Sequence, residues 1–279
     1  MAPSPAKPAG LAGRCVVVTR PAQQIGALLD ALRAAGAEAL FFPVVEILPL
    51  ADVAPLIALA DRLADYDYAF FVSANAVEQT LAVIERSRWP DLLGIVTVGP
   101  GSARALHVHG FDEVFLPVSH FDSEGVLALP AMQASEIAGK RVLVLRGDGG
   151  RELLAKTLLE RGAMVDVQSC YQRRRASTDP ADLLARFAAG QLDAISFTSS
   201  EGARNFVAIL DEAVDQAQRK GSAPDARTLL ASLPCFVPHS RVEEQLRSMG
   251  AQQLVLTDAG DAALIESLEN YFKQHRSRS

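Results

Sequence analysis

The sequence predicts an α/β protein built from open, doubly wound parallel sheets. Strand-like and helix-like segments alternate along almost the whole chain. The strand-like segments are apolar at nearly every position, as expected of parallel strands that helices cover on both faces. Such alternation produces right-handed βαβ units. A length of 279 residues allows one large domain or two smaller ones.

The first half of the chain gives the first elements. After a Pro- and Ala-rich lead-in, CVVVT (15–19) has the β-branched residues of a buried strand. Apolar residues at helical spacing follow over 25–32 and stop at Gly36, which predicts a helix. The extended segment 39–47 contains Pro43, so we expect it at a sheet edge or in a crossing linker. The same reasoning predicts helices at 55–65, 74–87 and 102–110 and strands at 68–73, 94–99 and 113–117.

The second half repeats this alternation after a helix-like stretch at 127–134. A polar insertion, residues 211–230, interrupts it before the last two strands. The strands expected here are 141–146, 164–174, 195–199, 235–238 and 254–257, and the helices are 152–162, 202–210, 242–250 and 263–272.

An internal duplication is visible when the chain is aligned on itself. Arg20 and Arg146 lie 126 residues apart, as do Ser73 and Ser199, and each stands at the end of a strand. Asp67 matches Asp193 and Phe71 matches Phe197 at the same offset. Generic strand–helix units would not easily reproduce these matches by chance. We therefore expect two similar modules facing each other across a cleft, with ligands at the carboxyl ends of the strands.

Small, hydroxylic or basic residues follow the ends of six predicted strands. A helix N-terminus offers unpaired N–H groups and a partial positive charge, so it binds carboxylate or phosphate. Helix capping alone is the alternative for Ser73, Ser102 and Ser199, and an ordinary surface position is the alternative for Arg20 and Arg146. The recurrence of this chemistry at corresponding turns favours a surface that binds several anionic groups.

Tyr171 lies in VQSCYQRR, just before three arginines. One interpretation is an aromatic ring that packs at an interdomain strand. The other is a phenol that donates a proton or a hydrogen bond to a leaving oxygen. Neither metal-ligand spacing nor a nucleophile triad is apparent, and Cys15, Cys170 and Cys235 are expected to be buried, reduced thiols.

Charge and hydropathy exclude several classes of protein. The 27 basic and 33 acidic residues give a net charge of −6, which argues against nucleic acid or an anionic membrane as partner. The N-terminus lacks the apolar region of a secretory signal, and no apolar stretch is long enough to span a bilayer. We expect a cytoplasmic location.

Eight segments together resemble the uroporphyrinogen-III synthase family. They occur in order along the chain and are VVVTRP (16–21), FFPVVEI (41–47), DYAFFVSANAV (67–77), VGPGSARAL (98–106), RVLVLRGDGGRELL (141–154), CYQR (170–173), DAISFTSSEG (193–202) and VPHSRV (237–242). The resemblance implies two flavodoxin-like domains joined by a two-stranded connector, with a cleft that opens and closes around the ligand. It places one discontinuous domain at 1–42 plus 174–279, a second at 47–168, and the connector at 43–46 and 169–173.

The resemblance also implies a reaction. The family substrate is hydroxymethylbilane, a linear tetrapyrrole with eight carboxylates, which loses its terminal hydroxyl as water to give an azafulvene cation. Ring D then closes in inverted orientation, through a spiro intermediate, to give uroporphyrinogen III. The task is mainly to hold a folded conformer, so neither a cofactor nor a metal is expected.

Family roles carry over residue by residue. Tyr171 matches the tyrosine that assists departure of the hydroxyl, and Ser199 and Ser200 match the binding serines. VPHSR stands where many members have a Gly-Pro-Thr-Thr-like turn, which argues against a threonine contact there. The other binding residues implied at matching turns are Thr19, Arg20, Ser73, Asn75, Ser102, Arg146, Gly147, Arg151, His239 and Ser240.

The resemblance further implies a monomer that receives hydroxymethylbilane by transient transfer from the preceding enzyme of the pathway. Two other functions remain as alternatives. One is a non-catalytic two-lobed protein that binds an anionic small molecule. The other is a nucleotide-dependent transferase, although RGDGGR (146–151) is neither GxGxxG nor a P-loop.

Overall fold

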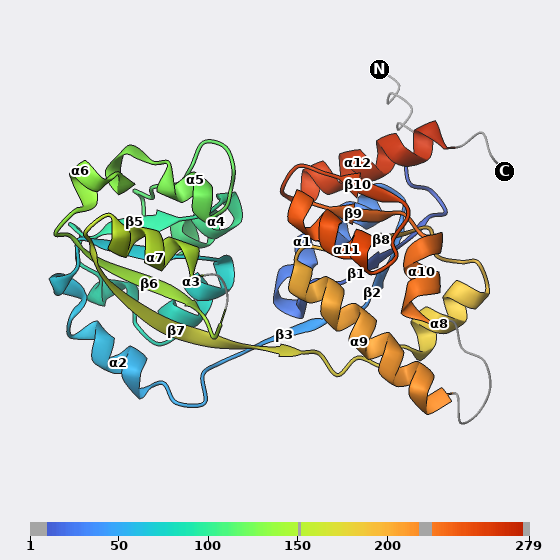
Figure 1. Cartoon of the computed structure of the whole chain (residues 1–279), viewed down its shortest axis with the longest axis horizontal. Helices are drawn as coiled ribbons and strands as arrows, with labels where there is room; N and C mark the ends of the chain where they lie inside the picture. The colour runs from blue at the N-terminus through green and yellow to red at the C-terminus, as the bar shows by residue number, and fades with distance from the viewer. Residues whose placement is uncertain (1–9, 150–151, 218–224, 276–279) are drawn as a thin grey trace, which may run out of the picture. The chain divides into compact units, whose positions relative to one another are not determined.

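The computed structural model describes residues 10–149, 152–217 and 225–275. The chain divides into two compact units. Unit 1 comprises residues 1–46 and 174–279, and unit 2 comprises residues 47–173. Both units are α/β and each contains one five-stranded sheet (Figure 1).

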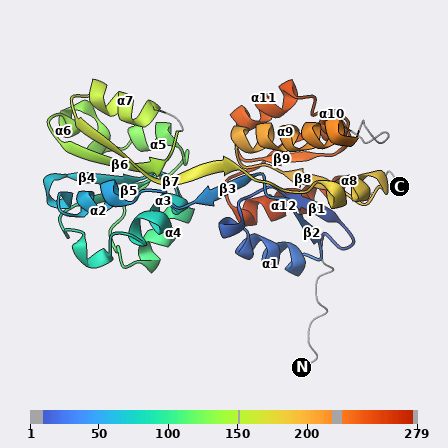
Figure 2. The same ribbon diagram turned by 90° about the horizontal axis from the view of Figure 1, so that it is seen from below.

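The sheet of unit 1 has the strand order β10-β9-β8-β1-β2, and its strands pair in parallel. Helices cover both faces of this sheet, α1 and α12 on one and α9, α10 and α11 on the other (Figure 2). The strands are β1 (Cys15–Val18), β2 (Glu38–Phe41), β8 (Ala194–Ser196), β9 (Cys235–Val237) and β10 (Leu254–Leu256). The helices are α1 (Gly26–Ala34), α8 (Ala181–Ala188), α9 (Ser200–Ala217), α10 (Ala226–Ser232), α11 (Ser240–Ser248) and α12 (Asp261–Gln274), with a short 3-10 turn at Ala22–Gln24.

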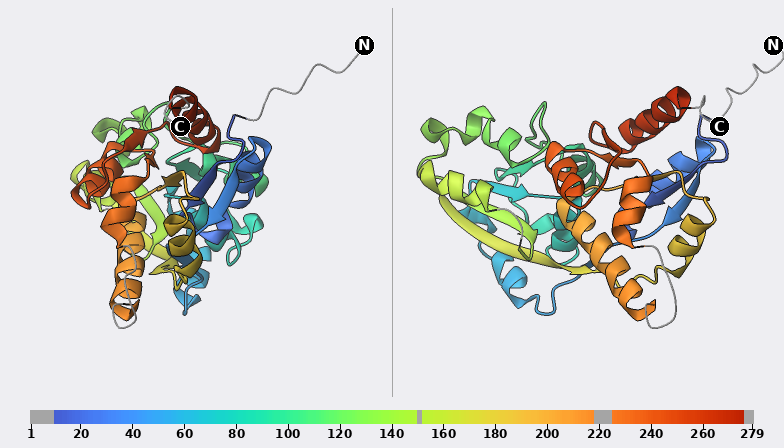
Figure 3. Two further views of the ribbon diagram at one scale, coloured as in Figure 1. Left: turned by 90° about the vertical axis from the view of Figure 1, so that its right-hand side faces the viewer. Right: turned by 45° about the vertical axis from the view of Figure 1, so that its right-hand side comes forward.

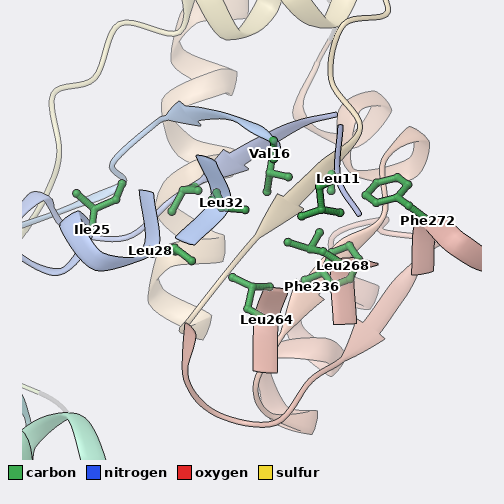
Figure 4. Close-up of a cluster of buried hydrophobic side chains, with 12 residues drawn as sticks. Leu11, Val16, Ile25, Leu28, Leu32, Phe236, Leu264, Leu268 and Phe272 are labelled. Atoms are coloured by element: carbon green, nitrogen blue, oxygen red, sulfur yellow. The ribbon is translucent and has the colours of Figure 1, made fainter. Parts of the chain in front are cut away.

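The core of unit 1 follows from helical spacing. Leu28 and Leu32 of α1, four residues apart, lie on one helix face and are fully buried. They pack in one cluster with Val16 of β1 and with Leu264 and Leu268 of α12 (Figure 4). This apolar contact fixes both helices against the same face of the sheet.

The sheet of unit 2 has the order β3-β7-β6-β4-β5. Phe115 adds one isolated parallel bridge to Val96 beyond β5. The strands are β3 (Val45–Leu48), β4 (Tyr68–Phe71), β5 (Gly94–Thr97), β6 (Arg141–Gly147) and β7 (Met164–Arg175). The helices are α2 (Ala54–Ala60), α3 (Ala74–Leu81), α4 (Pro100–Val108), α5 (Ser123–Leu127), α6 (Ala134–Ile137) and α7 (Leu153–Glu160), with 3-10 turns at Leu63–Asp65, Arg86–Arg88 and Pro130–Met132.

The sheet topology supports the duplication and shows that each sheet contains strands from both repeats. At the offset of 126 residues, β1 and β2 correspond to β6 and β7, and β4 corresponds to β8. Unit 1 combines β1 and β2 with β8, whereas unit 2 combines β6 and β7 with β4. In both sheets the first strand of one repeat lies beside a later strand of the other, β1 beside β8 and β6 beside β4. Each unit is therefore assembled from parts of both repeats.

Two aspartates stabilise this exchange in the same way. Asp67 accepts a hydrogen bond from the backbone N–H of Arg141 at 2.8 Å and pairs with Lys140 at 3.0 Å. Asp193 accepts from the backbone N–H of Cys15, also at 2.8 Å, and pairs with the preceding residue, Arg14. All these residues lie near the amino ends of the strands. The matched aspartates therefore hold neighbouring strands together at the amino edge of each sheet. They are not part of a site at the carboxyl edge.

Several expected elements differ from the structure. The expected strand at 113–117 is wrong, because only the single bridge of Phe115 forms there. The segment 39–47 is two strands, β2 and β3, which Phe42 to Val44 separate around Pro43. Both are edge strands, as the proline predicts.

The polar insertion 211–230 contains parts of two helices in its described residues. Residues 200–217 form one continuous helix, α9 (Figure 3), and α10 begins at Ala226 after the Asp225 side chain caps it. Helix α8 is absent from the sequence-based expectations altogether.

The three cysteines are free and buried, which confirms the expectation of reduced thiols. Within the described part of the chain, no helix is long and apolar enough to cross a membrane.

Candidate active site

The carboxyl edge of the unit 2 sheet brings Tyr171 and Ser73 together. The Tyr171 hydroxyl oxygen lies 3.1 Å from the Ser73 Oγ. Ser73 follows β4 and is the N-cap residue of α3, where its Oγ accepts the backbone N–H of Ala76 at 3.1 Å. Tyr171 is 3 % exposed, and Ser73 is half-buried. A phenol is thus fixed at the positive end of a helix.

Gly147 creates the space that the tyrosine ring occupies. A Cβ atom at this position would lie 2.6 Å from Cε2 and 2.7 Å from Cζ of Tyr171, closer than real contacts allow. The register between β6 and β7 shifts at this point, so that Gly147 pairs with Tyr171 and Cys170 is skipped. The position therefore requires glycine for a close approach of ring to backbone.

Asp148 holds the strand on both sides of the ring. Its backbone N–H donates to the carbonyl of Tyr171 at 2.9 Å. Its carboxylate accepts the backbone N–H of Arg173 at 2.6 Å. These two bonds fix the main chain of β7 beyond the bulge, which restricts where the Tyr171 ring can point.

Cys170, next to Tyr171, is 2 % exposed. Its Sγ lies 3.1 Å from the carbonyl oxygen of Arg146. Burial raises the pKa of this thiol to about 11, so it is protonated at neutral pH. A protonated, enclosed thiol is a poor nucleophile.

The other candidates of unit 2 lie along the same edge. Asn75 is in the first turn of α3 and is 8 % exposed. Ser102 is buried inside the first turn of α4, but Gly99 rather than Ser102 is the N-cap residue there. Arg146 precedes Gly147 at the end of β6 and is half-buried. Arg151 lies outside the described residues.

Ser199 in unit 1 repeats the capping geometry of Ser73. Its Oγ accepts the backbone N–H of Gly202 at 3.0 Å, in the turn that leads into α9. Ser200 follows, and its hydroxyl oxygen is buried without a hydrogen-bond partner among the described residues. Ser73 and Ser199 therefore both cap the turns that follow them, and such a cap still leaves the hydroxyl proton of each serine available.

The remaining unit 1 candidates differ widely in exposure. Thr19 is buried, and its hydroxyl donates to the carbonyl of Ser196 at 2.8 Å. Arg20 forms an ion pair with Asp261 at the start of α12. His239 and Ser240 are exposed at the N-terminus of α11.

Sequence reasoning missed the partners that organise these residues. The pairing of Ser73 with Tyr171, the two bonds of Asp148 and the ion pair of Asp261 all join segments distant in the chain. The sequence signal for them was the RGDGG segment, because its Gly147 and Asp148 position Tyr171.

Comparison with known proteins identifies the family of the chain. A family model described as uroporphyrinogen-III synthase HemD matches residues 26–266. The chain belongs to the uroporphyrinogen-III synthase family. It is therefore an enzyme, a cyclising lyase of haem biosynthesis, and the alternative of a non-catalytic binding protein is disfavoured.

Full-length relatives extend this match. The chain is 34% identical over 261 residues to the uroporphyrinogen-III synthase of Salmonella typhimurium, covering 91% of this chain and 99% of the relative. It is 31% identical over 257 residues to that of Escherichia coli, with the same coverage. A crystal structure of a mutant uroporphyrinogen III synthase from Thermus thermophilus is 15% identical, covers 95% of this chain and 100% of that one, and has a TM-score of 0.59. This structural likeness supports the two-unit α/β fold.

Proposed function

We propose that this chain cyclises hydroxymethylbilane to uroporphyrinogen III, with Tyr171 as the proton donor to the departing hydroxyl. The observation that carries the role of Tyr171 is its hydroxyl at 3.1 Å from Ser73, at the N-terminal end of α3 and the carboxyl edge of a parallel sheet. Ligands of open α/β sheets bind at this edge. The reaction is inferred from family membership, and the role of Tyr171 is inferred from this geometry.

The chemistry asks little of the protein beyond one proton and a fixed conformer. The bond between the methylene carbon and its hydroxyl breaks, and the electron pair leaves with oxygen. The phenol proton joins this oxygen to form water, while the pyrrole nitrogen supplies electrons to the azafulvene cation. Closure of ring D later releases a proton, which restores the phenol. No net acid, oxidant or cofactor is consumed.

Carboxylate binding by neutral groups explains how an acidic chain holds a polyanion. N–H groups and hydroxyls at helix N-termini bind carboxylates without a large positive net charge. Ser200, with its buried and unpartnered hydroxyl, and the exposed Ser240 suit this role. We include the other carboxyl-edge residues as binding candidates, namely Thr19, Arg20, Ser73, Asn75, Ser102, Arg146, Gly147, Arg151, Ser199 and His239.

We further propose that two domains, 1–42 plus 174–279 and 47–168, are joined by a connector at 43–46 and 169–173. The division of the chain within β3 and β7, at 46/47 and 173/174, falls at the ends of these connector segments and supports this assignment. Monomeric state, a cytoplasmic location and transient delivery of the substrate by the enzyme that makes it belong to the same proposal.

A product analysis tests the function directly. Freshly made hydroxymethylbilane is supplied, the products are oxidised, and the porphyrin isomers I and III are separated. Without an enzyme the linear tetrapyrrole closes to isomer I. We therefore expect more isomer III with the protein than in the protein-free reaction. An isomer ratio equal to that of the protein-free reaction would refute the proposal.

A further inference from the structure

We propose that Ser73 is a positioning residue for Tyr171. Its hydroxyl donates a hydrogen bond to the phenol oxygen and thereby leaves the phenol proton for the departing hydroxyl group of the substrate. This inference rests on the proposed function, in which Tyr171 is the proton donor. It differs from a direct contact between Ser73 and a substrate carboxylate.

The direction of the hydrogen bond follows from counting protons. A serine hydroxyl has one proton and two acceptor positions. Among the residues that the structure describes, Ser73 Oγ has two partners, the N–H of Ala76 and the phenol of Tyr171, each at 3.1 Å. The amide can only donate, so it occupies an acceptor position of Ser73. The serine proton is then satisfied if it points to the tyrosine oxygen.

A hydrogen bond donated by Tyr171 to Ser73 would be less favourable for proton transfer to the substrate. If the phenol donated to Ser73, the phenol proton would be committed to the helix cap, and the serine proton would lack a partner. With Ser73 as donor, the amide of Ala76, the serine and the phenol form one chain of hydrogen bonds that polarise each other. The positive end of α3 stands at the start of this chain.

This chain favours loss of the phenol proton. When the proton moves to the leaving oxygen, the O–H bond of Tyr171 breaks and its electron pair stays on the phenol oxygen. A hydrogen bond donated to that oxygen stabilises the negative charge that develops there. Tyr171 is 3 % exposed, so few water molecules can replace Ser73 as the donor.

The duplication supplies a matched control. Ser199 caps the turn into α9 by the same kind of bond, from Gly202 N–H at 3.0 Å. The side chain beside this turn is that of buried Val44, whose Cγ2 would lie 3.5 Å from a Cβ atom at Gly202. Ser199 therefore forms the same kind of helix cap as Ser73, but near an aliphatic side chain.

The experiment is a double-mutant cycle measured by turnover to isomer III. We expect Ser73→Ala to lower kcat about tenfold with little change in KM, the size of one hydrogen bond to a charged group. Ser73→Thr keeps the hydroxyl and should restore most of the activity. Ser73→Asp keeps the helix cap but has no proton to donate at neutral pH, so its kcat should stay low. In a Tyr171→Phe background, Ser73→Ala should cost less than about twofold.

Ser199→Ala separates a capping effect from coupling to the phenol. Its effect on kcat should be the same in the wild-type and Tyr171→Phe backgrounds, because among the described residues its Oγ forms no hydrogen bond with a tyrosine. Thermal unfolding of each variant reports the loss of the cap separately from the loss of turnover. The Thr and Asp variants keep a cap, so they test the proposal even if Ser73→Ala folds poorly.

Three results would overturn the inference while leaving the function intact. They are multiplicative losses for Ser73→Ala and Tyr171→Phe, wild-type kcat for Ser73→Asp, and a raised KM with unchanged kcat for Ser73→Ala, which indicates a carboxylate contact. Wild-type turnover in Tyr171→Phe would remove the role of the phenol and this inference with it. Failure of the wild-type chain to produce isomer III would instead refute the proposed function.

Discussion

Gly147 is the position at which a single methyl group tests the placement of Tyr171. In Gly147→Ala the new Cβ atom would lie 2.6 Å from the ring, whereas ordinary contacts begin near 3.4 Å. The ring or the strand must therefore move by about 0.8 Å. The hydrogen bond to Ser73, at 3.1 Å, tolerates a lengthening of only about 0.4 Å before it is lost.

The expected cost has two separable parts. Overpacking of a buried site typically lowers the free energy of unfolding by about 1–3 kcal/mol. A displacement near 1 Å of a group that acts on substrate can cost about a hundredfold in rate. We therefore expect Gly147→Ala to fold, to melt earlier, and to lose about ten- to a hundredfold in kcat per folded molecule.

Gly94→Ala is the matched control within the same unit. Gly94 begins β5, and a Cβ atom there would lie 2.6 Å from Cδ1 and 2.8 Å from Cε1 of another tyrosine, Tyr68, which begins β4. This variant should also be destabilised, but its turnover per folded molecule should match the wild type. Urea unfolding and isomer analysis measure the two quantities. Wild-type kcat in Gly147→Ala, or an equal loss of kcat in Gly94→Ala, would refute the reasoning.

Four further predictions concern the phenol, the amino-edge aspartate, the thiols and metals. Tyr171→Phe should lower kcat by up to about a hundredfold without lowering the melting temperature by more than a few degrees; wild-type turnover would dismiss the role. The backbone N–H of Arg141, followed by Lys140, lowers the pKa of Asp67. The stabilisation by Asp67 is therefore complete above the unfolded pKa near 4 and is lost as pH falls through the folded pKa. Asp67→Asn should cost about 1 kcal/mol at pH 7 in urea unfolding, and a difference that does not shrink as the pH falls below about 4 would contradict this. Burial raises the pKa of Cys170 to about 11 and that of Cys235 to about 12, so a disulfide reagent at pH 8 should label both thiols only after unfolding; rapid labelling of the folded chain would contradict their enclosure. Exhaustive chelation should leave turnover unchanged, and its abolition would contradict a metal-independent reaction.

Apolar patterning predicted the fold well where elements are fully buried. β1, β6 and β8 are apolar on both faces and were all recognisable, and α1 has a clear stripe of leucines. Helix α8 was missed although its apolar residues have helical spacing, and Leu183 is its one fully buried residue. The bridge at Phe115 looks like a strand in sequence, but one residue pairs and its neighbours do not.

The site was predictable by residue type but not by pairing. Ser73 and Tyr171 could each be singled out, one at a strand end and the other before a basic run. Their contact joins residues 98 positions apart and depends on the register shift at Gly147. Local periodicity carries no information on such a bulge, because one inserted residue changes which side chain faces the edge.

The duplication also explains why the two sheets need not share the chemistry equally. Ser73 follows β4 in unit 2 and Ser199 follows β8 in unit 1, and each caps the turn into the following helix. At the offset of 126 residues, however, Cys170 and Tyr171 of unit 2 correspond to Val44 and Val45 of unit 1. The substrate has eight carboxylates, so helix N-termini that bind carboxylate are useful in both units. Only one hydroxyl leaves, so one proton donor is enough. A duplicated scaffold with Tyr171 in one unit only fits that stoichiometry, in keeping with the proposed proton transfer in unit 2.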